Sequence, residues 1–184
     1  MSRFAARSPC PGRLRGAACA VLLLAFASGC GYALVGYGKL PDGVRSVAIP
    51  TLRNDSYEPG VEYVVTDALR REFLRRGAVD LTEDAAGADL VVTGTVLPLR
   101  TTTASFSPVV LALEYEITLT LNLRAERADG TQIPIGDRAL RESERYLVSA
   151  DAQATRKNRE EALRRVSRLL AGRVHDQLFE MRAR

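Results

Sequence analysis

Residues 109–127 read VVLALEYEITLTLNLRAER, and their pattern decides the fold. Every second residue from Leu111 to Leu123 is apolar, while the residues between them, Ala112 to Arg124, are small or polar. Successive side chains of a strand point to opposite faces. The segment therefore predicts a long antiparallel strand with one buried face and one solvated face.

The residues that follow predict a partner for this strand. Ala128-Asp129-Gly130-Thr131 is typical of a tight hairpin turn. We expect a returning strand over about residues 133–148, whose charged residues can pair with charges on the polar face of the long strand. These charged residues are Arg141, Glu142, Glu144 and Arg145.

Two segments show the apolar spacing of amphipathic helices. One is predicted over residues 61–76, with Gly77 as its stop. The other closes the chain and begins either after Ser149 as N-cap or near Lys157. The expected apolar stripes are Val61, Val65, Ala68, Leu69 and Phe73 in the first helix, and Leu163, Val166, Leu170, Val174 and Leu178 in the second, widened by Leu169 and Phe179.

Shorter strands are expected over residues 44–50, 78–82 and 90–100, the last bent or at an edge because of Gly94 and Pro98. The sequence thus predicts an α+β fold: a single domain, residues 44–184, with a mainly antiparallel sheet of about four strands and two helices packed on one face.

The net charge of +4 does not indicate nucleic-acid binding. Residues 1–29 carry four arginines and no acid, which accounts for the whole excess, so the rest of the chain is formally neutral. Neither a phosphate-binding glycine loop nor a nucleophile–base pair is present, and His175 is the only histidine. We expect no enzyme activity, no metal and no cofactor.

The N-terminal residues predict a lipoprotein signal. A basic segment precedes an uncharged, mostly apolar run over residues 17–28, which is too short to span a membrane. The run ends in Ala27-Ser28-Gly29-Cys30, which resembles a bacterial lipobox. We expect residues 1–29 to be the signal peptide, Cys30 to be acylated, and residues 30–43 to form a lipidated tether. The alternative is a plain secretory signal with an incidental cysteine.

Two loops are candidate binding elements because function concentrates in loops on a rigid scaffold. One is expected over residues 100–108. The other is expected over residues 149–159, where Arg156, Lys157 and Arg159 could pair with phosphate groups.

Several segments together resemble the LptE family of lipopolysaccharide-assembly lipoproteins. They are Cys30-Gly31-Tyr32-Ala33-Leu34, Val47-Ala48-Ile49-Pro50, Asn54-Asp55-Ser56-Tyr57-Glu58-Pro59-Gly60, Ala68-Leu69-Arg70-Arg71-Glu72-Phe73 and Ala88-Asp89-Leu90-Val91-Val92-Thr93-Gly94. The resemblance covers nearly all of residues 30–180.

The resemblance implies a non-enzymatic outer-membrane lipoprotein on the periplasmic side. Family members plug the lumen of the β-barrel translocon LptD, help it to assemble and contact lipopolysaccharide during export to the outer leaflet. Gly31, in place of an aspartate after the cysteine, agrees with the outer membrane. In some members cations at the start of the last helix help to hold the ligand, and Arg156 and Lys157 are the nearest matches.

Two other classes remain open at this point. The segment from Ala88 onward also resembles periplasmic lipoproteins that activate peptidoglycan synthases and lipoproteins that form secretion channels. An envelope hydrolase is the third possibility, and the missing nucleophile–base pair argues against it.

Overall fold

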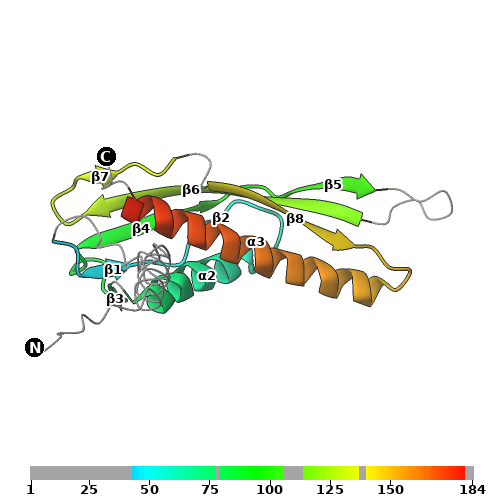
Figure 1. Cartoon of the computed structure of the whole chain (residues 1–184), viewed down its shortest axis with the longest axis horizontal. Coiled ribbons are helices and arrows are strands. Elements are labelled where there is room, and N and C mark those ends of the chain that lie inside the picture. Colours follow the sequence, from blue (N-terminus) through cyan, green and yellow to red (C-terminus); the bar gives the residue numbers. More distant parts are fainter. Residues whose placement is uncertain (1–42, 78, 106–113, 137–139, 181–184) are drawn as a thin grey trace, which may run out of the picture. The chain divides into compact units, whose positions relative to one another are not determined.

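The computed structural model describes residues 43–77, 79–105, 114–136 and 140–180, all within the unit formed by residues 37–184 (Figure 1). The expected signal peptide, Cys30 and nearly all of the expected tether lie outside the described residues. The elements follow in the order β1 (Ser46–Ala48), β2 (Arg53–Asn54), α2 (Val61–Arg76), β3 (Asp80–Thr82), β4 (Leu90–Val96), β5 (Arg100–Ser105), β6 (Glu114–Arg127), β7 (Gln132–Ile133), β8 (Arg141–Leu147) and α3 (Ala152–Glu180).

The long strand β6 organises the sheet. Its first half pairs antiparallel with β5 on one edge and β8 on the other, and its second half pairs antiparallel with β4 and β7. In Figure 1, β4 and β7 lie beside the left half of β6, and β5 and β8 lie beside its right half. The prediction of a long antiparallel strand is confirmed over Glu114–Arg127, while residues 109–113 lie outside the described part.

The sheet is mixed and has more strands than the four expected. β1 pairs in parallel with both β3 and β4, and β2 pairs in parallel with β4. The parallel strands have two or three residues each, so they have no alternation of their own from which to predict the pairing. The α+β class holds, but the expectation of a mainly antiparallel four-stranded sheet is wrong.

Two segments differ from their expected form. Residues 100–105, expected to lie in a loop, form β5, because threonine is a good strand former and β6 offers a pairing edge. The returning strand is split into β7 and β8, and Pro134, which has no backbone N–H to donate, lies just after β7.

The hydrophobic core lies between the sheet and the two helices. Every residue of the expected stripe in α2 is buried, as are the alternate residues Ile117, Leu119, Leu121, Leu123 and Ala125 of β6. In α3 the stripe is confirmed and Phe179 is buried, but Leu169 is 49% exposed and does not widen it. α2 ends where expected, at Gly77 (φ 61°), whose N–H donates to the carbonyl of Phe73.

The two helices run side by side in the same direction. Glu58, just before α2, pairs with Arg159 near the start of α3, and Arg76 at the end of α2 pairs with Asp176 near the end of α3. Residue i of α2 therefore lies beside residue i + 100 of α3. Gly172 agrees with this alignment, because a Cβ there would lie 3.8 Å from Glu72 Oε1.

Gly94 lets β4 and β6 approach closely. It pairs with Leu123, and a Cβ on residue 94 would lie 2.9 Å from the Cα of Leu123 and closer still to the carbonyl oxygen of Asn122. The expected edge position of this strand is wrong, because β4 lies between β1 and β6 and keeps an unbroken register with β6 through Gly94. Gly94 instead marks a contact that only hydrogen can occupy.

Candidate functional site

The candidate ligand-binding residues Arg156 and Lys157 lie in α3 and not in the loop expected over residues 149–159. The helix begins at Ala152, and the Oδ1 of Asp151 accepts a hydrogen bond from the N–H of Gln153 at 2.8 Å. Asp151, and not Ser149, is therefore the capping residue. Ser149 supports the turn, since its Oγ accepts from the N–H of Asp151 at 3.2 Å.

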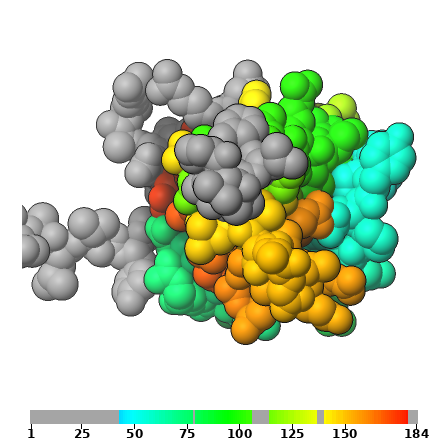
Figure 2. All heavy atoms as spheres, turned by 90° about the vertical axis from the view of Figure 1, so that its right-hand side faces the viewer, coloured from blue at the N-terminus to red at the C-terminus, as the bar shows by residue number. Residues whose placement is uncertain are grey.

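Arg156 and Lys157 are free to meet an anion. Both are exposed, and neither forms an ion pair or hydrogen bond with any residue of the described part of the chain. They project from the first two turns of α3, where the positive end of the helix dipole also favours anions. Figure 2 faces this end of the unit, with the start of α3 in yellow and orange.

Arg159, expected as a third cation of the same loop, has a different role. Its Nη1 donates to Oε1 of Glu58 at 2.5 Å, and both side chains are less than a third exposed. The hydrogen bond to Glu58 raises the pKa of Arg159 above its usual range. Arg159 therefore joins α3 to the loop before α2 and is not available to a ligand.

The loop before α2 is braced by the side chains of its own residues. The amide of Asn54 accepts from the N–H and Oγ of Ser56, and its Nδ2 donates to the carbonyl of Glu58 at 2.8 Å and to the carboxylate of Glu62 at 2.7 Å. Tyr57, at the tip, is 99% exposed. The Asn-Asp-Ser-Tyr-Glu-Pro-Gly segment that resembles the LptE family is thus a loop held by hydrogen bonds of Asn54.

The outer face of the sheet is polar, as expected. The carboxylate of Glu116 lies 3.7 Å from the guanidinium of Arg145, and the hydroxyls of Thr118 and Ser143 share a hydrogen bond of 2.8 Å. Further along β6, Asn122, Arg124 and Glu126 on this face are exposed. The expected pairing of strand charges across β6 and β8 is therefore present for Glu116 and Arg145.

Glu142 and Glu144 do not join this polar face. They stand opposite Leu119 and Ile117 of β6, so their side chains point to the helices. Glu144 Oε1 accepts from Arg165 Nε at 2.7 Å, and Glu142 pairs with Arg173. The sequence could have indicated this orientation through Tyr146. This aromatic residue lies on the same strand face as Glu142 and Glu144, and it is buried beside Tyr115.

His175 is a buried residue of the core, 4% exposed, and not the surface or half-buried histidine that was expected. Its ring stacks on Phe179 with centroids 3.9 Å apart and meets the edge of Phe73 at 5.1 Å. Neither ring nitrogen has a hydrogen-bond partner. Burial, with a contribution from Arg76, lowers the pKa of His175 to about 4, so the ring is neutral at pH 7.

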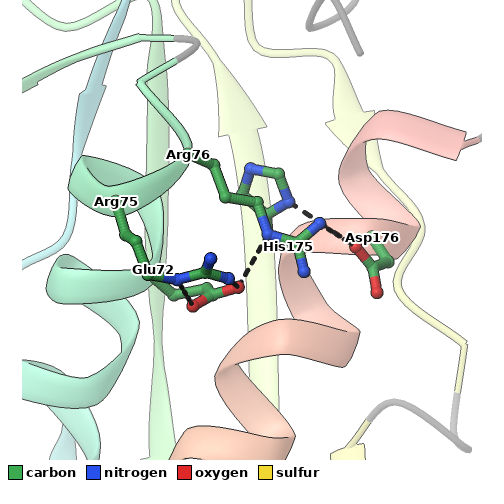
Figure 3. A network of polar contacts seen from close by, with 5 residues as sticks. All are labelled: Glu72, Arg75, Arg76, His175 and Asp176. Carbon is green, nitrogen blue, oxygen red and sulfur yellow. Dashed lines mark hydrogen bonds and ion pairs between the residues drawn. The ribbon is translucent and has the colours of Figure 1, made fainter. Parts of the chain in front are cut away.

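The charged residues around His175 belong to the seam between the helices (Figure 3). Glu72 accepts from Arg75 and Arg76, and Arg76 also pairs with Asp176. The hydrogen bond from Arg75 is the main cause that lowers the pKa of Glu72.

No group of three or more potential ligands that could hold a metal ion occurs among the described residues. None of the helices in the described ranges is both long and apolar enough to cross a membrane.

Comparison with known families assigns the chain. The model of the LptE family, described as lipopolysaccharide assembly, matches residues 44–178. The chain belongs to the LptE family. The matched range begins where the sequence predicted the folded domain to begin, and it contains every described element through most of α3. The search of curated proteins found no significant match to this chain.

Solved structures share the LptE fold at low sequence identity. Lipoprotein B from Nitrosomonas europaea is 13% identical with a TM-score of 0.56, covering 83% of this chain and 93% of its own. Rare lipoprotein B from Shewanella oneidensis is 18% identical with a TM-score of 0.50, covering 72% and 96%. Hypothetical protein CT253 from Chlamydia trachomatis is 12% identical with a TM-score of 0.51, covering 73% and 98%. These likenesses show the fold alone.

Proposed function

We propose that this LptE-family chain is an outer-membrane lipoprotein, held on the periplasmic side through acylated Cys30. In this proposal it plugs the lumen of an LptD-type β-barrel translocon, assists assembly of the barrel and aids export of lipopolysaccharide to the outer leaflet. The role is non-enzymatic. The observation that carries the proposal, beside family membership, is the exposed polar face of the sheet, whose opposite face packs on both helices.

The polar face is suited to the inside of a barrel. Barrel lumens are lined by polar side chains, and a plug must meet them without burying an unpaired charge. The outer face of β6 and β8 carries both signs of charge close together, as in Glu116 with Arg145 and Arg124 next to Glu126 in the same row. Because each of these charges has an opposite charge nearby, the surface can contact a polar barrel wall without leaving an unpaired charge away from water.

The first experiment is purification of the tagged full chain from native envelopes in mild detergent, with mass spectrometry of the proteins that accompany it. A near-stoichiometric outer-membrane β-barrel is the expected result. A peptidoglycan synthase, or a ring of the chain itself, would replace this proposal with one of the alternatives left open by the sequence.

Lipidation has its own test. Cys30→Ser should leave the folded domain intact and release the chain from the membrane fraction, because the thiol that carries the lipid is gone. Incorporation of labelled palmitate into the Cys30→Ser variant would disprove acylation at this residue.

Arg156 and Lys157 are proposed to contact lipopolysaccharide. They are unpaired cations beside the N-terminal end of α3, and phosphate groups are the anions they would meet. Combined charge reversal, Arg156→Glu with Lys157→Glu, should reduce lipopolysaccharide binding by the purified complex about tenfold. The swap Arg156→Lys with Lys157→Arg keeps the charge and serves as the matched control. Equal binding by both variants, with the barrel still attached, would remove these residues from the site and leave the plug proposal standing.

A further inference from the structure

The two edges beside the first half of β6 differ in whether a further strand could join them. On the β8 edge, side chains of α3 donate hydrogen bonds to backbone carbonyls: Asn158 to Leu147 at 3.0 Å, Arg165 to Arg145 at 3.2 Å and Arg173 to Arg141 at 3.4 Å. These bonds occupy the groups with which another strand would pair. The β8 edge is therefore closed by the helix that lies along it.

The edge formed by β5 is open. β2 covers the same side of β4 only as far as Val96, whose carbonyl accepts from the N–H of Asp55 at 3.0 Å. Beyond this point β5 pairs with β6 alone, and its outer backbone groups have no partner among the described residues. Figure 1 shows β5 at the margin of the sheet. A strand added here would continue the line of β2.

The side chains of β5 leave this edge accessible. Residues 100–103 are exposed on both faces of the strand. Proline, lysine and inward-pointing charges, which protect exposed edges in many proteins, do not occur in β5. The strand does contain an irregularity, but it lies between Thr103 and Ser105, beyond the regular pairing of residues 100–103 with β6. The edge therefore keeps the pairing capacity of an ordinary strand.

We infer that β5 pairs antiparallel with β5 of a second copy of this chain, about a two-fold axis through Thr102. A strand can join this edge only if it has an open edge of its own, and β5 of a second copy supplies one. In this register Thr102 faces Thr102 of the second copy, and each Thr101 faces a Thr103. Threonine pairs favourably with threonine across strands. Each Arg100 faces the small Ala104, so like charges are not brought together.

The rest of the fold is compatible with this pairing. Because the axis passes through a residue and not between two residues, the faces of the two sheets stay in line. α3 lies along β8, on the other side of β6, so it does not enter the interface. Two-fold symmetry is the commonest arrangement of homo-oligomers. The interface is only one short strand wide, so we expect a weak and reversible dimer.

The dimer is separate from the barrel plug. It uses the edge of the sheet, whereas the proposed plug uses the polar face, and it is a state of the free chain. A barrel can therefore accompany the chain whether or not the dimer forms, and the dimer can form without a barrel.

Native mass spectrometry of the purified full chain, released from mild detergent, measures the fraction of dimer. We expect this fraction to rise with concentration between about 1 and 100 µM. Thr102→Lys should lower it at least about fivefold, because two like charges then stand opposite each other, and Thr102→Glu should do the same. An equimolar mixture of the two variants should restore the dimer, because lysine then faces glutamate.

Ala128→Lys is the matched control. Ala128 is exposed at the turn after β6, whereas β5 pairs with the beginning of β6. One lysine added there should change the dimer fraction less than about twofold. Thermal melting checks that each variant is folded, and restoration in the mixture shows that loss of the dimer did not come from misfolding.

Disulfide trapping gives a second measurement. Residues directly opposite in antiparallel strands have Cα atoms about 4.5–5.5 Å apart, which lies within the range that a disulfide spans. Thr102→Cys should therefore form a covalent dimer under mild oxidation of native envelopes. Ala128→Cys keeps the same native cysteines and gives the background.

Three results would overturn the inference. The first is a monomer at every concentration, together with no trapping of Thr102→Cys above background. The second is a dimer that Thr102→Lys leaves unchanged, which would place the interface elsewhere. The third is trapping of Thr102→Cys to a different envelope protein, which would assign the open edge to a strand of that protein.

Discussion

Arg159 of α3 donates a hydrogen bond of 2.5 Å to Glu58, a residue 101 positions earlier in the chain. The pair joins the braced loop before α2 to the second turn of α3, and each side chain is less than 30% exposed. It fixes one end of the helix pair, as Arg76 and Asp176 fix the other.

Loss of this ion pair should lower stability more than loss of a surface pair. Glu58→Gln leaves the half-buried guanidinium without its counter-charge, and we expect the free energy of unfolding to fall by about 1–2 kcal/mol. Asp55→Asn, which removes the exposed partner of Arg53, should have no measurable effect. Urea unfolding of both variants compares them, and equal effects would show that the Glu58–Arg159 pair has no special role.

Two glycine-to-alanine substitutions should have opposite effects. Gly94→Ala places a methyl group against the backbone of β6, so we expect a loss of about 1–3 kcal/mol. Gly172→Ala, in α3, meets no atom closer than 3.8 Å and gains helix propensity, so we expect a gain of up to about 1 kcal/mol. Melting temperatures of the two variants test the prediction, and a Gly94→Ala chain as stable as the original would contradict the close approach of β4 and β6.

The burial of His175 predicts a loss of stability in mild acid. The folded state holds the pKa of the ring at about 4, below the value of 6.5 in an unfolded chain. The unfolded state therefore binds more protons between these values, so the contribution is complete above pH 6.5 and is lost as the pH falls to 4. The shift corresponds to about 3 kcal/mol.

Unfolding by urea at intervals between pH 7 and pH 4 measures this effect. In the His175→Leu variant the fall of stability between pH 6.5 and pH 4 should be smaller, because the ring that takes up the proton on unfolding is gone. Identical pH profiles for the two chains would show that folding does not lower the pKa of His175.

Asp89 should act as a clamp between β1 and the start of β4. Its Oδ2 accepts hydrogen bonds from the N–H groups of Arg45 and Ser46 at 2.8 and 2.9 Å, and these bonds lower the pKa of Asp89. Asp89→Ala removes the acceptor, so the melting temperature should fall. Asp89→Asn keeps one side-chain oxygen as an acceptor, so its melting temperature should fall less than that of Asp89→Ala. A larger effect of asparagine than of alanine would argue against the acceptor role.

The sequence predicted well those elements in which apolar residues recur regularly along one face over many residues. The alternation of β6 and the stripes of α2 and α3 were visible because each buries one face over many residues. β1 and β3 lie within segments that were predicted to be strands, but β2 and the parallel pairing of all three were missed. Two or three residues carry no period, and parallel pairing depends on tertiary contacts.

The sequence grouped Arg156, Lys157 and Arg159 as cations of one loop, but the structure places all three in α3 and pairs Arg159 with Glu58. The helix start depends on Asp151, and polar residues without an apolar stripe fill the first two turns. The directions of Glu142 and Glu144 were missed, because strand register sets which face a polar side chain occupies. The packing of α2 beside α3 joins two segments about 100 residues apart, which no local pattern connects.

The partnership of α2 with α3 has a consequence for how the chain reaches its folded state. The apolar stripe of α2 is synthesised early, but its neighbour is the last element of the chain. Until α3 is synthesised, α2 has no helix beside it, and part of the apolar inner face of β6 stays uncovered. Folding therefore cannot finish during synthesis, and an intermediate with exposed apolar surface must persist until the C-terminal residues emerge.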